Sequence, residues 1–292
     1  MKPNKKLIIT TYLCLTVIGI LCIFIFFIPK GPKATYSINS TFLIENKRGA
    51  MTSQCYKTTD LFYNEDGISF PVKIQNQNDR DVCYSVILIM NDKQILTTVG
   101  KETALHHDYK INANDFLDIN VEIEKEYFDE HSVNELLFVF RQDIDCFSVD
   151  NPLLEKSNTI FINYAVSSLD EPENKSQNAS SEKKPVLEIT PLEQPENGLI
   201  RKKNHRTLGL KISPTSVLKS EYKVFCMIGS DITNFDDNNY LYLKANTHEP
   251  VITDIDISSA IGKNEVELFA VPADRYEKRE EIIKGNRFTL SD

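Results

Sequence analysis

The chain has 292 residues, of which 41% are hydrophobic and 26% charged, and it contains no Trp. This composition is that of a globular protein, and it excludes collagen-like, coiled-coil and wholly disordered chains. The 33 basic and 42 acidic residues give a net charge of −9, and the five Lys that precede Thr35 leave −14 for the remainder. A field of that sign repels phosphate backbones, which argues against nucleic acid as a partner.

The first predicted element is a transmembrane helix from Leu7 to Ile28, behind a cytoplasmic tail at 1–6. These 22 residues carry no charge and extend about 33 Å as a helix, enough to cross a hydrocarbon core of roughly 30 Å. A cleaved signal peptide is the alternative, but its apolar region is shorter, and residues 29–34 make a poor cleavage site. The Lys residues before the span favour a cytoplasmic N-terminus. We therefore expect a single-pass plasma-membrane protein whose C-terminal part is extracytoplasmic.

Two similar units follow the span. Three pairs of segments match in order and spacing: 70–74 with 208–212, 84–90 with 222–228, and 134–136 with 264–266. The first two pairs share an offset of 138 residues and the third has an offset of 130, so the first unit carries about eight extra residues between them. The common order and spacing predict a duplicated fold.

Short strands dominate both units. Residues 117–123 and 251–257 alternate between apolar and polar types, and this period of two places one set of side chains inward. Residues 136–140 form a continuous apolar run, which is typical of a central strand buried on both faces. The expected fold class is all-β: two antiparallel β-sandwich domains in tandem behind one transmembrane helix.

At superfamily level, this strand pattern resembles tandem immunoglobulin-like or fibronectin-type-III-like modules over about 40–166 and 185–291. The absence of Trp and of a Cys…Trp…Cys signature excludes an antibody-type domain. The resemblance implies a first Ig-like sandwich at 35–166 and a second at 185–292. Residues 167–184 contain no aromatic or β-branched residue, which predicts a flexible acidic linker and relative movement of the two units.

The cysteines suggest one disulfide. Cys83 opens a predicted strand, and Cys146 follows the strand that would lie antiparallel beside it. We expect a Cys83–Cys146 disulfide, which the extracytoplasmic side permits. A Cys55–Cys146 bridge and the absence of any bridge are the alternatives. Cys226 aligns with Leu88 inside a strand, so a free core thiol is expected there.

Metal and catalytic motifs are weak. The acidic turn at 234–239 resembles the first half of an EF-hand loop, but Asn239 replaces the required Gly and Ala245 replaces the bidentate Glu. An irregular calcium site has three weak candidates: Asp231, Asp236 and Asp237. A solvated turn is the alternative. The segment 106–108, with two His and one Asp, is expected to be a polar loop. Hydrolase, nucleotide-binding and zinc-protease motifs are missing, so neither a cofactor nor enzymatic activity is expected.

Two loops are the expected surfaces for a protein partner. Their large side chains are Phe147, Leu153 and Leu154 in the first unit, and Tyr276, Ile282 and Ile283 in the second. Inward packing of these side chains is the alternative. The expected function is non-enzymatic binding or scaffolding, with an envelope or membrane protein as partner.

Two other functions stay open. A carbohydrate or wall-polymer binding module requires exposed aromatic rings on one sheet face, for which Tyr222, Tyr240 and Tyr242 are candidates. A hydrolase requires a cleft with two carboxylates about 5–10 Å apart. The Lys-, Ile- and Asn-rich usage is typical of a low-GC Gram-positive bacterium.

Overall fold

The computed structural model describes twelve stretches of the chain: residues 40–45, 51–52, 61–132, 134–143, 157–168, 187–193, 199–202, 205–218, 220–236, 238–262, 264–273 and 282–291. All of them belong to one of two compact units, Ile38–Asp292, the other being Met1–Ser37. Within these stretches no helix has the length and apolarity needed to cross a membrane. The predicted span from Leu7 to Ile28 and linker residues 169–184 lie outside them.

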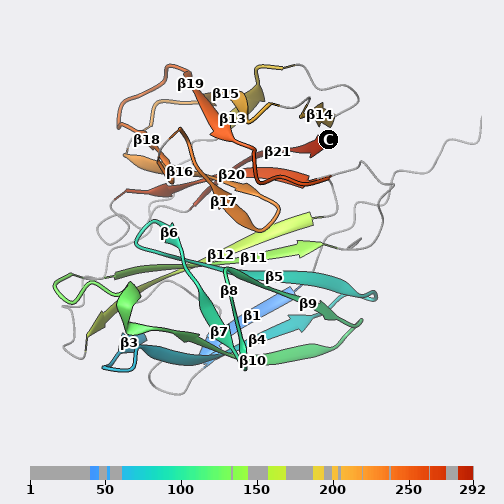
Figure 1. The fold of residues 1–292 in the computed structure, drawn as a ribbon, viewed down its shortest axis with the longest axis vertical. Coiled ribbons are helices and arrows are strands. Elements are labelled where there is room, and N and C mark those ends of the chain that lie inside the picture. Colours follow the sequence, from blue (N-terminus) through green and yellow to red (C-terminus); the bar gives the residue numbers. More distant parts are fainter. Residues whose placement is uncertain are drawn as a thin grey trace, which may run out of the picture. The chain divides into compact units, whose positions relative to one another are not determined.

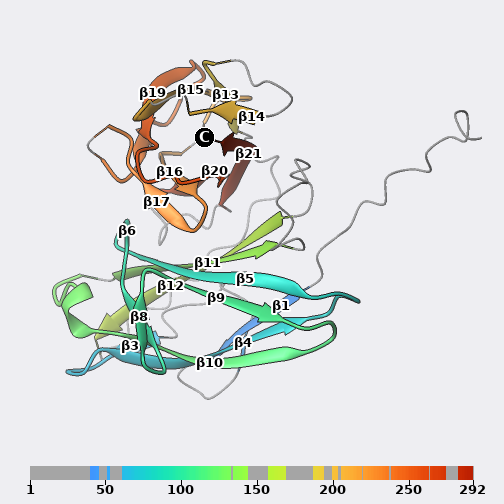
Figure 2. The ribbon, with the colours of Figure 1, turned by 45° about the vertical axis from the view of Figure 1, so that its right-hand side comes forward.

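The first sandwich has two sheets (Figures 1 and 2). Its first sheet has the order β2 (Met51–Thr52), β1 (Ser40–Glu45), β4 (Ile68–Asn76), β10 (Phe116–Ile123), β7 (Thr97–Val99) and β8 (Glu102–Ala104). Its second sheet has the order β3 (Leu61–Tyr63), β12 (Ser157–Ser168), β11 (Asn134–Asp143), β5 (Val82–Met90) and β6 (Lys93–Gln94), and β9 (His106–Ile111) also pairs with β5. A 3₁₀ turn, η1, covers Lys125–Tyr127.

The second sandwich repeats this plan with fewer strands. Its first sheet has the order β13 (Leu187–Pro191), β15 (Thr207–Pro214) and β19 (Val251–Asp256). Its second sheet has the order β14 (Leu199–Arg201), β21 (Ile283–Ser291), β20 (Asn264–Pro272), β16 (Tyr222–Ile228) and β17 (Asp231–Thr233), and β18 (Leu241–Leu243) also pairs with β16. In both sandwiches the strand order matches the A-B-E and G-F-C order of immunoglobulin-like folds, which confirms the all-β prediction.

Strand register bears out the predicted repeat. Leu88 lies opposite Phe138 in the first sandwich, and Cys226 lies opposite Leu268 in the second. The turn after β5 and the turn after β16 also agree, because Asn91 and Gly229 both have positive φ, at 48° and 63°. The backbone N–H of Asn91 donates to the Glu135 carbonyl, and that of Gly229 donates to the Glu265 carbonyl, both at 2.9 Å. Each of these glutamates is the second residue of the neighbouring strand. The duplication therefore extends to individual hydrogen bonds.

Each sandwich encloses its own apolar core. In β10 the buried residues Ile119, Val121 and Ile123 alternate with exposed polar ones, as the two-residue period predicts. In the run 136–140 all five side chains are fully buried. Alternate residues of this run, from Leu136 to Phe140, face the first core. Leu137 and Val139 point the other way, into a separate cluster. The prediction of burial on both faces is therefore confirmed.

One predicted loop is a strand. Residues 106–108 begin β9, which pairs with β5 and places His106 opposite Ile87. The ring of His107 is buried, and its Nε2 lies 3.0 Å from the Thr97 carbonyl oxygen. The polar composition of the segment concealed a strand whose inward positions continue with Tyr109 and Ile111.

Candidate functional site at the contact between the sandwiches

A third buried cluster joins the second sheets of the two sandwiches. It consists of Ile87, Ile89, Leu137 and Val139 from the first sandwich and Phe225, Met227, Phe269 and Val271 from the second. We call this set the shared cluster. Three pairs occupy equivalent positions of the repeat: Ile87 and Phe225, Ile89 and Met227, Val139 and Phe269. Each sandwich thus contributes the same face of the same sheet, as in a two-fold symmetric dimer.

Aromatic rings occupy the middle of the shared cluster. The ring centroid of Phe269 lies 4.7 Å from that of Phe161 on β12 and 5.4 Å from that of Phe225. Tyr240 packs against Phe225 at 5.8 Å. Phe225 and Phe269 are fully buried. The sheet faces that meet here are therefore not available to another ligand.

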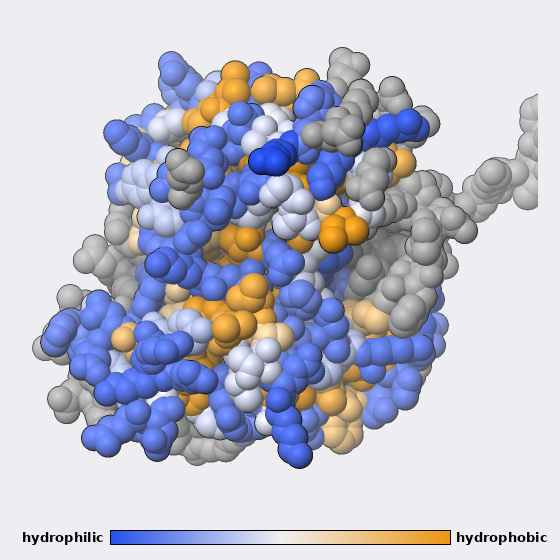
Figure 3. Space-filling model, viewed as in Figure 1, coloured by the Kyte–Doolittle hydropathy of each residue, from blue (hydrophilic) through white to orange (hydrophobic). Residues whose placement is uncertain are grey.

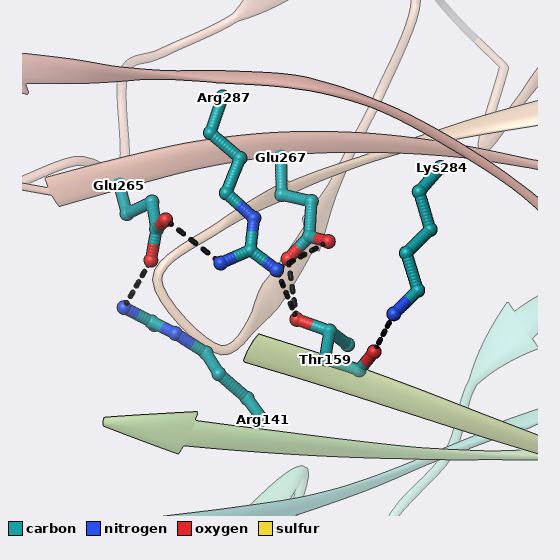
Figure 4. A network of polar contacts seen from close by, with 6 residues as sticks. All are labelled: Arg141, Thr159, Glu265, Glu267, Lys284 and Arg287. Atoms are coloured by element: carbon teal, nitrogen blue, oxygen red, sulfur yellow. Dashed lines mark hydrogen bonds and ion pairs between the residues drawn. The ribbon is translucent and has the colours of Figure 1, made fainter. Parts of the chain in front are cut away.

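A polar network lies beside the shared cluster (Figure 4). Arg287 on β21 donates from Nη2 to Glu267, at 2.9 Å, and to Thr159 Oγ1, at 3.0 Å. Its Nη1 donates to Glu265 at 3.3 Å. From the first sandwich, Arg141 Nη2 donates to the other oxygen of Glu265 at 3.2 Å. The Thr159 hydroxyl donates to Glu267 at 2.5 Å, which completes the connection between the sandwiches.

Burial makes this network energetically important. Glu267 is only 2% exposed, so its charge depends on Arg287 and Thr159 for compensation. Lys284 Nζ donates to the Thr159 carbonyl oxygen. Burial lowers the pKa of Lys284, while the charge of Glu267 acts in the opposite direction. Both glutamates are bound by guanidinium groups, so this carboxylate pair does not offer the free acid and base that a hydrolase requires.

A second polar contact lies at β6 and β17. Gln94 accepts the Ile232 N–H at 2.7 Å and donates to the Ser230 carbonyl oxygen at 3.1 Å. Gln94 and Ile232 are equivalent positions of the repeat, so this contact is also nearly symmetric. Beside it, His106 Nδ1 lies 3.3 Å from Asp231 Oδ1. Elsewhere along the contact, Lys223 Nζ forms an ion pair with Asp92.

The calcium candidates occupy different surroundings. Asp231 is exposed and faces His106, and Asp236 is exposed with a positive φ of 50°. Asp237 lies outside the described residues. In the described part of the chain, no three His, Cys, Asp or Glu side chains are grouped so as to hold a metal ion.

The partner-contact candidates are only partly described. Phe147, Leu153, Leu154 and Tyr276 lie outside the described residues. Ile283 is 5% exposed within the second core, and Ile282 packs against the shared cluster. Both isoleucines thus adopt the inward packing that the sequence left as the alternative.

The candidate sugar-binding tyrosines do not form an exposed row. Tyr222 is buried in the second core, and Tyr240 packs on Phe225. Tyr242 is 42% exposed, and its hydroxyl donates to Glu221. The aligned rings that a carbohydrate module would use are therefore not provided by these three residues.

Cys226 is a free, fully buried thiol, as predicted. Burial raises its pKa well above the usual range. Since the thiolate is the nucleophile, we expect Cys226 to resist iodoacetamide in the folded protein and to react after denaturation. Mass spectrometry of the Cys226 peptide measures this difference, and rapid labelling under native conditions would contradict the burial.

Cys83 is disulfide-bonded, while its expected partner Cys146 and Cys55, the alternative partner of Cys146, lie outside the described residues. Strand pairing places Cys83 opposite Asp143, three residues before Cys146. We expect a non-reducing digest to link the Cys83 peptide to the Cys146 peptide, and reduction to cost about 4 kcal/mol of stability. Linkage to Cys55 would refute this pairing.

No family model and no curated protein matches the chain. Among solved structures, the YadV chaperone is 10% identical with a TM-score of 0.29, and the match covers 84% of this chain and 98% of that one. The E. coli chaperone DraB is 9% identical with a TM-score of 0.31, covering 87% and 99%. A Porphyromonas gingivalis W83 protein of unknown function is 8% identical with a TM-score of 0.26, covering 87% and 99%. These scores are too low to support an argument about function.

Proposed function

We propose that this chain is a single-pass, membrane-anchored binding or scaffolding protein without enzymatic activity. Its sandwiches would lie outside the cytoplasm and engage an envelope or membrane protein. The observation that carries this proposal is the contact between equivalent sheet faces. This contact joins two small modules into one larger scaffold that positions loops and sheet edges.

The free energies of burial and linker closure favour one rigid body over two loosely tethered modules. Burial of a large apolar side chain contributes about 1.5–3 kcal/mol, so the eight side chains of the shared cluster contribute about 12–24 kcal/mol, which is an upper estimate. The entropic cost of closing a linker of this length is about 3 kcal/mol. The free energy of the buried contact therefore exceeds the entropic cost of closing the linker. This opposes the relative movement of the two sandwiches that the linker composition predicts.

The membrane anchor rests on the uncharged segment from Leu7 to Ile28. The disulfide at Cys83 agrees with an extracytoplasmic location, because such bonds are rare in the cytosol. Protease added to intact protoplasts is expected to digest the sandwiches and leave a membrane-bound N-terminal fragment. Full protection of the sandwiches until lysis would refute this orientation.

Crosslinking of the full-length protein in intact cells, followed by mass spectrometry, tests the binding role. We expect one reproducible membrane or secreted protein partner, and crosslinked residues that include the neighbourhoods of Phe147 and Tyr276. Capture of wall polymer alone, or of nothing, would contradict the proposal. A chain lacking residues 1–34 is the matched control, since loss of the anchor removes the high local concentration near membrane partners.

A further inference from the structure

The first sheets of the two sandwiches differ at one edge. In the first sandwich β10 pairs with β7, and β7 pairs with β8, so this edge extends by a hairpin. In the second sandwich β19 is the last strand of its sheet. Its outer side meets the described chain through an isolated bridge between Phe235 and Ile255 and through a hydrogen bond from the Thr233 hydroxyl to the Asp256 carbonyl. Among its described residues, the second sandwich therefore has no counterpart of the hairpin that lengthens the equivalent sheet of the first.

The bridge shows which backbone groups of β19 point outward. Asp236 N–H donates to the Asp254 carbonyl at 3.3 Å, and Asp256 N–H donates to the Asn234 carbonyl at 3.0 Å. Along a strand, the backbone groups of residues two apart point to the same side. Ile252 therefore directs its N–H and C=O to the same outer side as Asp254 and Asp256. Within the described part of the chain, no strand pairs with Ile252 on that side. The open stretch begins after Pro250, which has no N–H.

The exposed side chains of β19 itself, Ile252 and Asp254, are apolar and acidic, while the exposed Lys211 lies opposite Ile252 on β15. Ile252 is 68% exposed and Leu192 is 53% exposed. Leu192 lies over Gly209, where an added Cβ would come within 2.8 Å of its Cδ1. Gly209 is paired with Asp254, which is exposed, as is Glu249. Figure 3 shows apolar surface among hydrophilic residues at the top of the view, over the strands of this sheet.

We infer that the β19 edge at 252–254 is a docking site for an extended segment of a partner protein, which adds a strand to the sheet. The segment would place an apolar side chain on Ile252, and basic side chains opposite Asp254 and Glu249. Unpaired edge groups give affinity to such strand addition, and the side chains give specificity. The inference rests on the proposed binding function and names the surface that carries it.

Amide exchange of the full chain in detergent micelles, measured by NMR, tests the edge directly. Two synthetic peptides serve as probes, one alternating lysine with valine and one alternating glutamate with valine. We expect the lysine peptide to slow exchange of the Ile252 and Asp254 amides about tenfold or more, and the glutamate peptide to have no such effect. Protection by neither peptide, or equal protection by both, would overturn the inference.

Two variants distinguish an effect on pairing at this edge from a general loss of stability. Ile252→Pro removes the outward N–H and leaves the hydrogen bonds to β15, because proline is tolerated where the N–H of an edge strand faces solvent. Ile252→Thr keeps the N–H and the β-branched shape. Binding of the lysine peptide is expected to be lost in the first variant and largely retained in the second. Equal binding by both variants would overturn strand addition.

The same variants distinguish this inference from the proposed function. If wild type and Ile252→Pro capture the same partner equally well in cells, the binding function stands and the β19 edge is not its docking site. If wild type captures no protein, the binding function fails whatever the peptides do.

Discussion

Replacing Arg287 with Met is expected to lower the free energy of unfolding by about 3–5 kcal/mol, the usual cost of leaving a buried charge without its partner. Glu267, which is 2% exposed, would keep only the Thr159 hydroxyl as a hydrogen-bond partner among the contacts described above. Guanidinium chloride unfolding of the purified chain measures the change, and the slope of the transition reports whether it stays two-state.

A double variant distinguishes charge burial from packing. Glu267→Leu together with Arg287→Met is expected to recover most of the loss, because Leu137 occupies the equivalent position in the first sandwich. Lys125→Ala is the control, since its ion pair with Glu130, at 2.8 Å, is exposed and such pairs contribute little. If Arg287→Met unfolds at the wild-type midpoint, the network does not contribute to stability.

Phe269→Ala is the second substitution with a large expected effect, a loss of about 3–5 kcal/mol. The side chain is fully buried and touches rings from both sandwiches, so its removal leaves a cavity in the shared cluster. Hydrogen exchange is expected to increase first in β11, β16 and β20, while β4, β10 and β15 in the first sheets remain protected.

Two controls locate this effect. Phe116→Ala, at an exposed site, is expected to change stability by less than about 0.5 kcal/mol. Phe138→Ala removes a ring from the first core instead and is expected to weaken protection across the first sandwich. If Phe269→Ala and Phe138→Ala give the same exchange pattern, the shared cluster is not a separate stabilising region.

Sequence periodicity was sufficient for the main strands and both cores, but not for β9 or for the contact between the sandwiches. The run 136–140 predicted a strand buried on both faces, and the structure agrees. Periodicity identifies which side chains point inward, but it does not identify what covers them. The apolar run at 224–228, which is equivalent to 86–90, was the available signal, because strands with such runs in one chain can cover each other.

The polar residues of the contact were missed for a related reason. Acidic side chains are mostly exposed in folded proteins, whereas Glu267 is buried. It interrupts an apolar strand at the position equivalent to Leu137, which was the one local sign of a special environment. Its partner Thr159 is 108 residues away, and Arg141, the partner of the neighbouring Glu265, is 124 residues from that glutamate, so short spacing motifs do not reveal them.

The contact is only nearly symmetric, and its differences explain why it joins two different sandwiches of one chain and not two identical ones. Two copies of the second sandwich, joined through the same faces, would set Glu265 against Val271 and Lys223 against Ser230. Those arrangements would lack the charge pairing that Arg141 and Asp92 supply. Like-with-like association is thereby disfavoured, so copies of the protein at high concentration are expected to remain separate molecules instead of exchanging halves.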